Sequence, residues 1–194
     1  RDKSPDSLQS VRPVRRYPIP PTLDTAGDFE SIATVTVGSG GASNVEFASI
    51  VGTYQHLQIR GLVRNTGSTQ RSVSIRFNND TASNYAFHLL YGNGSSAGAE
   101  NGASQTGMQA ISQVFSTAGA NIFSAFVIDI LDYASTSKAT TIRSLGSRDE
   151  NGAGLVTLYS GLWTSTSAVT EIDLYPLADN FAQHSTFALF GIKA

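Results

Sequence analysis

The chain has 194 residues, which is enough to bury the core of one large β domain, with or without an extension. It contains no cysteine, which excludes disulfides and thiolate metal sites, while 18 glycines and a charged fraction of only 14% are typical of a turn-rich all-β protein. The net charge is −2, but it is unevenly distributed. Residues 1–16 hold five basic and two acidic residues, and the remainder holds eight basic and thirteen acidic residues. The acidic balance of the body argues against nucleic-acid binding by it.

Residues 1–27 predict an extended arm. Five of the six prolines lie within the first 21 residues, and proline lacks the N–H donor that helices and inner strands need. The opening RDKSP has no apolar stretch and no later run approaches the ~20 residues of a membrane helix, so neither a signal peptide nor a membrane span is expected. A solubilising tail is the alternative, but spaced apolar and basic residues favour docking on a protein partner. The predicted docking residues are Leu8, Val11, Arg12, Val14, Arg15, Arg16, Tyr17 and Ile19.

The body, 28–194, begins with two predicted hairpins. Apolar and polar residues alternate in 32–37 and 45–49 on either side of a glycine-rich turn, and again in 57–64 and 72–78 around the turn 66–70. In the second hairpin Arg60, Arg64 and Arg76 fall on the polar face. We expect this cationic face to form an ion ladder with cross-strand carboxylates such as Glu46 or Asp173, or else a subunit interface.

The rest of the chain predicts further strands at 84–91, 122–133, 140–145, 154–166, 169–175 and 186–193. The small polar segment 92–107 predicts a long surface loop, and 108–115 fits either two helical turns or a strand. About nine or ten strands without βαβ alternation indicate an antiparallel β-sandwich. Segments 87–91 and 123–130 are apolar on both faces, so we expect a helix at 108–115 to cover one of them and a neighbouring subunit the other.

No residue pattern in the chain predicts an enzyme. The histidines His56, His88 and His184 lie on separate predicted strands, and no Gly-x-Ser-x-Gly motif is present. Asp129 and Asp132 are three positions apart, so on one strand they face opposite sides. The oxygen-rich turns 78–81 and 149–151 lack the ligand spacing of an EF-hand loop, and the single tryptophan is expected in the core rather than stacked on a sugar. We therefore predict no catalytic residue, no metal and no cofactor.

Eight strings in the body are similar to a known family when they are taken together. They are FESIATVTVGSGGASNVEFASI, YQHLQIRG, RFNND, SNYAFHLLYGNGSS, VIDILDYAS, IRSLG, SGLWTSTSAVTEIDLYP and FAQHSTFALFGIKA. As a set they resemble virion structural proteins of tailed bacteriophages, of the capsid-accessory or tail-fibre type, which are common in phages of cyanobacteria and aquatic bacteria. The resemblance implies a jelly-roll-like sandwich, often trimeric, whereas the arm matches no pattern of that family.

The functional prediction is a non-enzymatic component of the phage particle surface. We expect a capsid cement or decoration protein, anchored by its arm to the major capsid protein or to tail proteins and assembled as a homotrimer. The alternative is a tail-fibre or tail-tip module that binds a host receptor or glycan. A partner surface with an acidic character would suit the basic arm.

Overall fold

The computed structural model describes residues 28–69, 71–113 and 115–193, so the docking residues predicted in the arm lie outside the described part of the chain. In that part no helix is long and apolar enough to cross a membrane. The described residues form twelve strands rather than the predicted nine or ten. These are β1 (Phe29–Thr36), β2 (Val45–Phe47), β3 (His56–Val63), β4 (Arg71–Phe77), β5 (Tyr85–Gly92), β6 (Ala97–Gln105), β7 (Met108–Gln113), β8 (Ser124–Leu131), β9 (Thr140–Asp149), β10 (Gly154–Trp163), β11 (Ile172–Pro176) and β12 (Thr186–Ile192).

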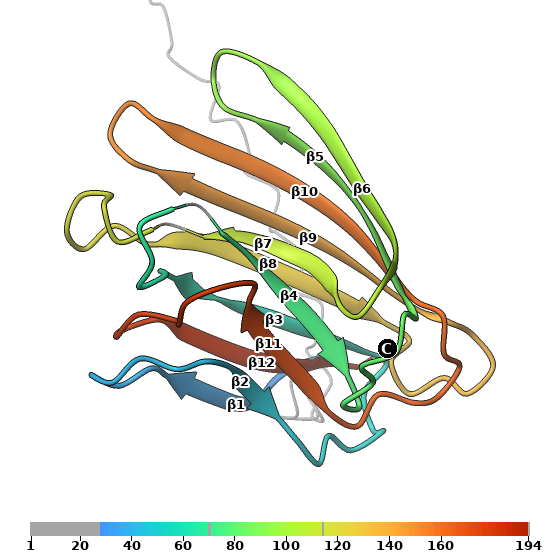
Figure 1. The fold of residues 1–194 in the computed structure, drawn as a ribbon. Helices are drawn as coiled ribbons and strands as arrows, with labels where there is room; N and C mark the ends of the chain where they lie inside the picture. The colour runs from blue at the N-terminus through green and yellow to red at the C-terminus, as the bar shows by residue number, and fades with distance from the viewer. Residues whose placement is uncertain (1–27, 70, 114, 194) are drawn as a thin grey trace, which may run out of the picture.

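The strands form two antiparallel sheets, as predicted for an all-β sandwich (Figure 1). The large sheet has eight strands in the order β1-β12-β3-β8-β9-β10-β5-β6, and the small sheet has four in the order β2-β11-β4-β7. Without β5, β6, β9 and β10, the order β1-β12-β3-β8 opposite β2-β11-β4-β7 is that of an eight-stranded jelly roll. The fold is therefore a jelly roll whose first sheet is doubled in width.

Two inserted hairpins produce this widening. The β9–β10 hairpin follows β8 in the chain and pairs with it, and the β5–β6 hairpin adds to the free edge of β10. The β9–β10 turn carries Asn151 and Gly152 at φ 59° and 115°, and the backbone N–H of Glu150 donates to the carbonyl of Ala153 at 2.8 Å. Positive φ at both central residues is the geometry that matches the twist of two flanking strands, so the predicted polar turn is a tight hairpin.

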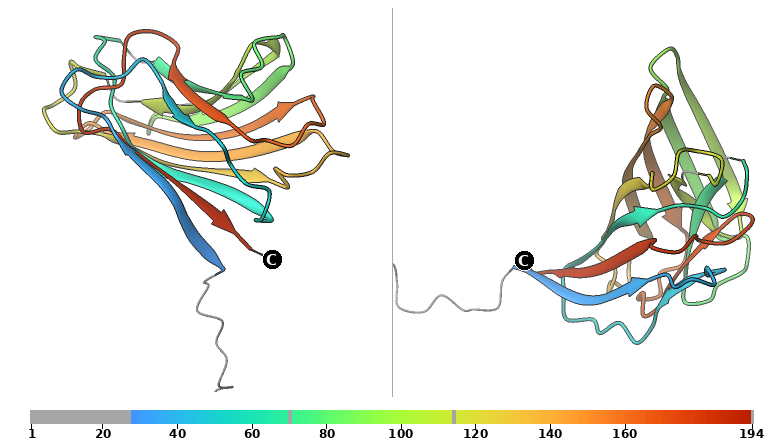
Figure 2. Two further views of the ribbon diagram at one scale, coloured as in Figure 1. Left: turned by 90° about the horizontal axis from the view of Figure 1, so that it is seen from below. Right: turned by 90° about the vertical axis from the view of Figure 1, so that its left-hand side faces the viewer.

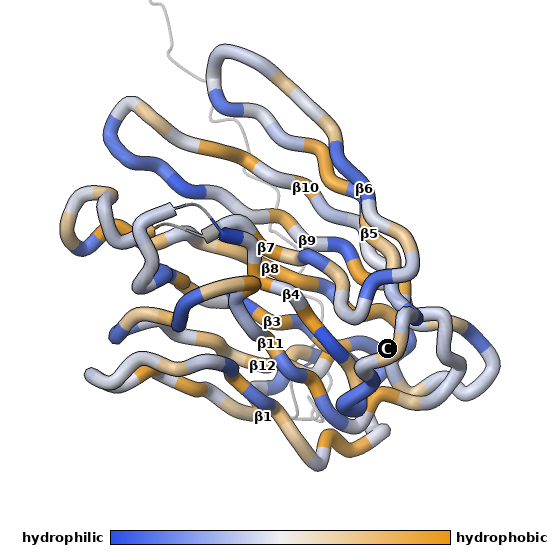
Figure 3. Tube along the Cα trace, viewed as in Figure 1, coloured by the Kyte–Doolittle hydropathy of each residue, from blue (hydrophilic) through white to orange (hydrophobic). Residues whose placement is uncertain are grey.

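The core lies between the two sheets and follows the alternation of the sequence (Figure 3). Along strand β8, buried residues alternate with residues that are exposed or partly exposed. Phe126, Ile128 and Ile130 face the core, and the residues between them face outward. The sheets approach closely at Gly161, where an added Cβ would lie 2.5 Å from the Sδ of Met108 on β7. A side chain at this position would therefore displace the side chains of Met108 and Ile142.

Both predicted hairpins at the start of the body are wrong. β1 pairs with β12 and β2 with β11, while β3 belongs to the large sheet and β4 to the small one. The connections 37–44 and 64–70 therefore cross between sheets instead of joining neighbours. Alternation reports only that one face of a strand is buried, and this holds equally for a hairpin partner and for a strand in the opposite layer.

The predicted long loop 92–107 is also wrong. Only Asn93–Ser96 form a turn, closed by a 3.1 Å hydrogen bond from the Asn93 N–H to the Ser96 carbonyl, and β6 follows. Strand β6 consists of small and polar residues because it is the outer edge of the large sheet, and aromatic rings of β5 lie over its glycines at 98 and 102. For 108–115 the strand alternative is correct over Met108–Gln113.

The two ends of the described chain meet at one end of the large sheet (Figure 2). The backbone N–H of Lys193 donates to the carbonyl of Asp28 at 2.9 Å, and the Lys193 ammonium pairs with Glu30 at 2.5 Å. Strand β1 is an edge strand, so the chain enters the body at the rim of the sandwich.

Candidate functional site

The solvent face of the large sheet carries a continuous apolar row. The strand register aligns one outward residue from each of five neighbouring strands, so that their side chains lie side by side. Three of them are unusually open for leucine, with exposed fractions of 59% for Leu90, 52% for Leu145 and 49% for Leu158. We call this set the apolar row: Ala99, Leu90, Leu158, Leu145 and Val127. Arg60 on β3, the register partner of Val127, lies next in line.

A second outward row, two residues further along the strands, extends the patch. It contains Val156 on β10, Ala125 on β8 and Leu62 on β3, with exposed fractions of 57% for Val156 and 45% for Leu62. Single exposed apolar residues are ordinary, whereas a contiguous patch marks a surface that contacts something else. The apolar row together with Val156, Ala125 and Leu62 is named the apolar face below.

A polar row flanks the apolar row on its other side. In order across the sheet it consists of Asn101, His88, Ser160, Arg143, Asp129 and Gln58. Asp129 accepts hydrogen bonds from Gln58 Nε2 at 2.5 Å and from Arg143 Nε at 2.8 Å. Partial burial raises the pKa of Asp129, but these hydrogen bonds outweigh it, so the pKa lies below its usual range and the carboxylate is ionised at neutral pH.

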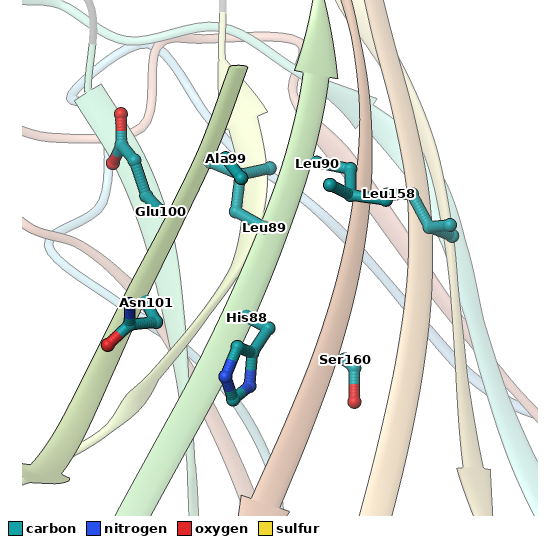
Figure 4. A pocket seen from close by; sticks show the side chains of 8 residues that line it. All are labelled: His88, Leu89, Leu90, Ala99, Glu100, Asn101, Leu158 and Ser160. Atoms are coloured by element: carbon teal, nitrogen blue, oxygen red, sulfur yellow. The ribbon is translucent and has the colours of Figure 1, made fainter.

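The two rows meet in a shallow concavity of about 250 Å³ over strands β6, β5 and β10 (Figure 4). Leu90 and Leu158 lie side by side at one end of it, and His88 and Ser160 lie at the other. The concavity can accommodate an apolar side chain from a partner and offer it polar neighbours. It is part of the same surface as the apolar face.

The structure does not bring Arg60, Arg64 and Arg76 onto one face, so the predicted cationic face is not formed. Arg60 lies on the outer side of β3, with its guanidinium 4.8 Å from the ring centre of Phe29. Arg76 lies on the small sheet, opposite Asp173 in the register and 3.8 Å from its carboxylate, so the expected cross-strand ion pair with Asp173 is formed by Arg76. The reason is the pairing error described above, because β3 and β4 belong to different layers.

Arg64 is a structural clamp. Its two terminal nitrogens donate four hydrogen bonds of 2.7–3.0 Å to backbone carbonyls of the segment before β8. The acceptors are Ser116, Ala118, Gly119 and Ile122. A planar guanidinium can serve several acceptors in fixed directions, whereas a lysine ammonium cannot span them.

Replacing Arg64 with lysine is therefore expected to destabilise this segment. We expect the free energy of unfolding to fall by about 1–3 kcal/mol, which is the size of a lost set of charge-assisted hydrogen bonds. Urea denaturation measures the loss, and hydrogen exchange is expected to quicken in residues 115–123. Arg143→Lys is the matched control, because that side chain is 69% exposed and a change below about 0.5 kcal/mol is expected. Equal losses in the two variants would contradict the clamp.

Of the titratable side chains that sequence analysis considered for catalysis, His56 and Asp132 lie together, with 3.5 Å between His56 Nδ1 and Asp132 Oδ1, and the others are elsewhere. His56 Nδ1 accepts a 3.0 Å hydrogen bond from the backbone N–H of Asp132, whose carboxylate pairs with Lys138. His184 is in a turn at φ 71° and not on a strand, and His88 lies on the polar row. Within the described ranges, no three His, Asp or Glu side chains are grouped closely enough to hold a metal ion.

Trp163 is 2% exposed and belongs to the core, as predicted. Its Nε1 donates to Asp80 Oδ2 at 2.7 Å, and Asn84 Nδ2 donates to the same oxygen at 2.8 Å. Asn78 Oδ1 accepts backbone N–H groups of Thr170 and Glu171 at 2.9 and 3.1 Å. The side-chain oxygens of Asn78 and Asp80 in this turn thus have structural partners within the protein.

Sequence analysis missed most of the apolar face. It marked 87–91 and 123–130 as apolar on both sides, which includes Leu90 and Val127, but not the outward residues of β9 and β10. The signal was present in GLVTLYSGLW, where Val156 and Leu158 alternate with residues that are themselves buried, such as Thr157 and Tyr159. In a two-layer fold only one side of each strand packs against the other sheet. A strand that is apolar on both sides therefore exposes apolar side chains to solvent on its outer side.

The chain was compared with protein families, curated proteins and solved structures. No protein-family model, no curated protein and no solved structure matches this chain.

Proposed function

We propose that this protein is a non-enzymatic structural component of a bacteriophage virion, most simply a capsid cement or decoration protein. In this proposal residues 1–27 dock on a major capsid or tail protein, and the body assembles as a homotrimer at the particle surface. The sequence strings given above and the jelly-roll strand order support it.

The apolar face is the observation that carries the proposal. Five of the eight large hydrophobic side chains that are exposed among the described residues lie on it: Leu62, Leu90, Leu145, Val156 and Leu158. Leaving such an area in water forgoes about 25 cal/mol for each Å² that a partner could cover. A protein with this surface is suited to assembly, and the flanking charges are held in local ion pairs such as Arg143–Asp129.

The path of the chain suits attachment through the arm. Residue 28 lies at the rim of the large sheet, beside the edge strand β1, and the apolar face lies on strands β3, β8, β9, β10, β5 and β6. Assembly of three bodies would bring three arms to one partner, and linked weak contacts give a much stronger attachment than one arm alone.

Purified particles of the phage that encodes the chain provide the test. Antibodies against residues 28–194 are expected to label the particle surface in electron microscopy, and a chain that begins at Asp28 is expected to fold but not to bind particles that lack the protein. The full-length chain is the control for binding. Absence of the protein from particles, or equal binding without the arm, would contradict the proposal.

A groove on the other side of the large sheet favours a second candidate, a tail-fibre module that binds a glycan. It has a volume of about 280 Å³ and lies where the inner side of β5, β6 and β10 extends past the small sheet. Its lining includes the Tyr91 ring, Asn93, Glu100 and Arg148. An aromatic ring beside hydrogen-bonding side chains is the combination that binds a sugar residue. Binding on an array of bacterial glycans that Tyr91→Ala abolishes and Leu90→Ala does not would favour this candidate.

A further inference from the structure

We infer that the apolar face is covered by a second copy of this chain, in a two-fold pair whose symmetry axis runs along the strands between β8 and β9. In this arrangement Arg143 of one copy faces Asp129 of the other. The inference rests on the self-association in the proposed function, but it assigns this face to a two-fold contact and not to the three-fold contact of a homotrimer. It is drawn from the register of the large sheet and the charges on its outer side.

The composition of the face selects the occupant. Its aliphatic side chains offer no aromatic ring for a sugar to stack on, which disfavours a glycan. Its charged side chains are Arg143 and Asp129 in the polar row and Arg60, which lies opposite Val127 in line with the apolar row, so the face does not attract the basic residues 1–16. The face is close to neutral and carries both signs of charge beside an apolar row. Two copies of such a face can therefore pair apolar groups with apolar groups and positive charges with negative charges.

The direction of the axis follows from the two kinds of row. Rotation about an axis parallel to the strands keeps every row at its own height, so apolar row meets apolar row and polar row meets polar row. Rotation about an axis across the strands reverses the order of the rows, so the polar row of one copy faces the second outward row of the other. It would set each strand against the same strand of the other copy, so that Asp129 meets Ala125 and Arg60 meets Arg60. Burying a charge against an aliphatic group is costly, and like charges repel. The strand-parallel axis is therefore favoured.

The position of the axis follows from charge. An axis on β9 would place Arg143 against Arg143 of the other copy, which is repulsive. An axis between β9 and β8 places Arg143 against Asp129 instead, because these residues are register partners on the two strands. The same axis pairs Leu145 with Val127, since these are also register partners.

The next strands outward agree with this position. β10 and β3 lie one strand beyond β9 and β8, so the same axis matches Val156 of one copy with Leu62 of the next. It also sets Leu158 against Arg60, whose guanidinium is directed over the Phe29 ring, so that the aliphatic part of Arg60 meets Leu158. Six strands at about 4.8 Å spacing and three rows at about 7 Å give a face on the order of 500–600 Å² per copy. Two such faces bury roughly 1,000 Å² or slightly more, which reaches the lower range of specific protein interfaces.

The test uses full-length chains with reversed charges. Arg143→Asp and Asp129→Arg are each expected to weaken self-association at least tenfold in sedimentation, because each places like charges across the axis. Mixing the two variants restores opposite charges between copies, and native mass spectrometry is expected to show assemblies that contain both. Repulsion within each copy is unchanged by mixing, so recovery reports the contact between copies. Thermal melting confirms that each variant is folded.

Leu158→Asp is the second variant, and it is expected to give a folded monomer at micromolar concentration. Asp132→Arg, which reverses a charge away from the two rows, is the control and is expected to leave association unchanged. Failure of the mixture to recover, or an unchanged assembly with Leu158→Asp, would overturn the inference. Neither result depends on the presence of the protein in particles, so the inference and the proposed function can fail separately.

Discussion

Replacing Ile128 with alanine is expected to lower the free energy of unfolding by about 2–5 kcal/mol, the range for deleting a buried aliphatic side chain. Ile128 is 0% exposed and lies in the middle of β8, which is itself in the interior of the large sheet. The small sheet packs against this side of β8, so the space left by the side chain cannot be filled by water or by a surface loop. Urea denaturation followed by tryptophan fluorescence measures the change, because Trp163 is in the core.

Val127→Ala is the matched control, because it removes an aliphatic side chain from the opposite face of the same strand. Val127 is only partly buried in one copy, and a loss below about 1 kcal/mol is expected for the dissociated protein. At concentrations where copies associate, the Val127 variant is expected to lose more. A loss below about 0.5 kcal/mol for Ile128→Ala would mean that this side of β8 is not part of the core.

Replacing Asp80 with alanine is expected to cost about 2–3 kcal/mol, although the residue lies in a turn. Its carboxylate accepts hydrogen bonds from Trp163 Nε1 at 2.7 Å, Asn84 Nδ2 at 2.8 Å and the backbone N–H of Ala82 at 2.9 Å. The substitution leaves the indole N–H of a buried tryptophan without its acceptor, and an unsatisfied buried donor costs more than an exposed one. Asp149→Ala, at the end of β9, is the control and is expected to change stability by less than about 1 kcal/mol.

The same carboxylate predicts a dependence on pH. Hydrogen bonds from Asn84 and Trp163 lower the pKa of Asp80 in the folded state, so the ionised form stabilises the fold. This contribution is complete above the ordinary aspartate pKa of about 3.9 and is lost as the pH falls through the lower pKa of the folded state. The difference in stability between the wild type and Asp80→Asn is therefore expected to be largest near neutral pH and to shrink below about pH 4. A difference that stays constant from pH 7 to pH 2.5 would contradict this role.

Sequence analysis predicted the fold class because alternation is a local property. Ile128 and Ile130 are buried on the strand where they were expected, and the turn at 151–152 closes a hairpin. The pairing of strands is not local. Jelly-roll connections pass from one sheet to the other, and the polar segments 37–44 and 64–70 contain turn residues whether they join neighbours or cross the sandwich.

Sequence analysis predicted much less of the candidate site. Arg60, Arg64 and Arg76 share a period in the sequence, but they have three different environments because their strands belong to different layers. The apolar face needs the register of five strands before Leu90, Leu158 and Leu145 can be seen as neighbours. In β6 the lack of bulky residues concealed a strand, since the rings that cover its glycines come from β5.

The meeting of Asp28 and Lys193 at the rim has a mechanical consequence. Strand β1 is held on one side only, by antiparallel partners that run from Phe29 opposite Ile192 to Thr36 opposite Thr186. Consider a load between residue 28 and the end of β12 at Thr186, which lies opposite Thr36. This load acts along β1 and shears all these hydrogen bonds together. A load between residues 28 and 193 acts across the strand and peels them one pair at a time. We therefore expect the body to resist tension along the arm with a much higher rupture force than tension between its two ends, which atomic force spectroscopy with the two attachment geometries measures.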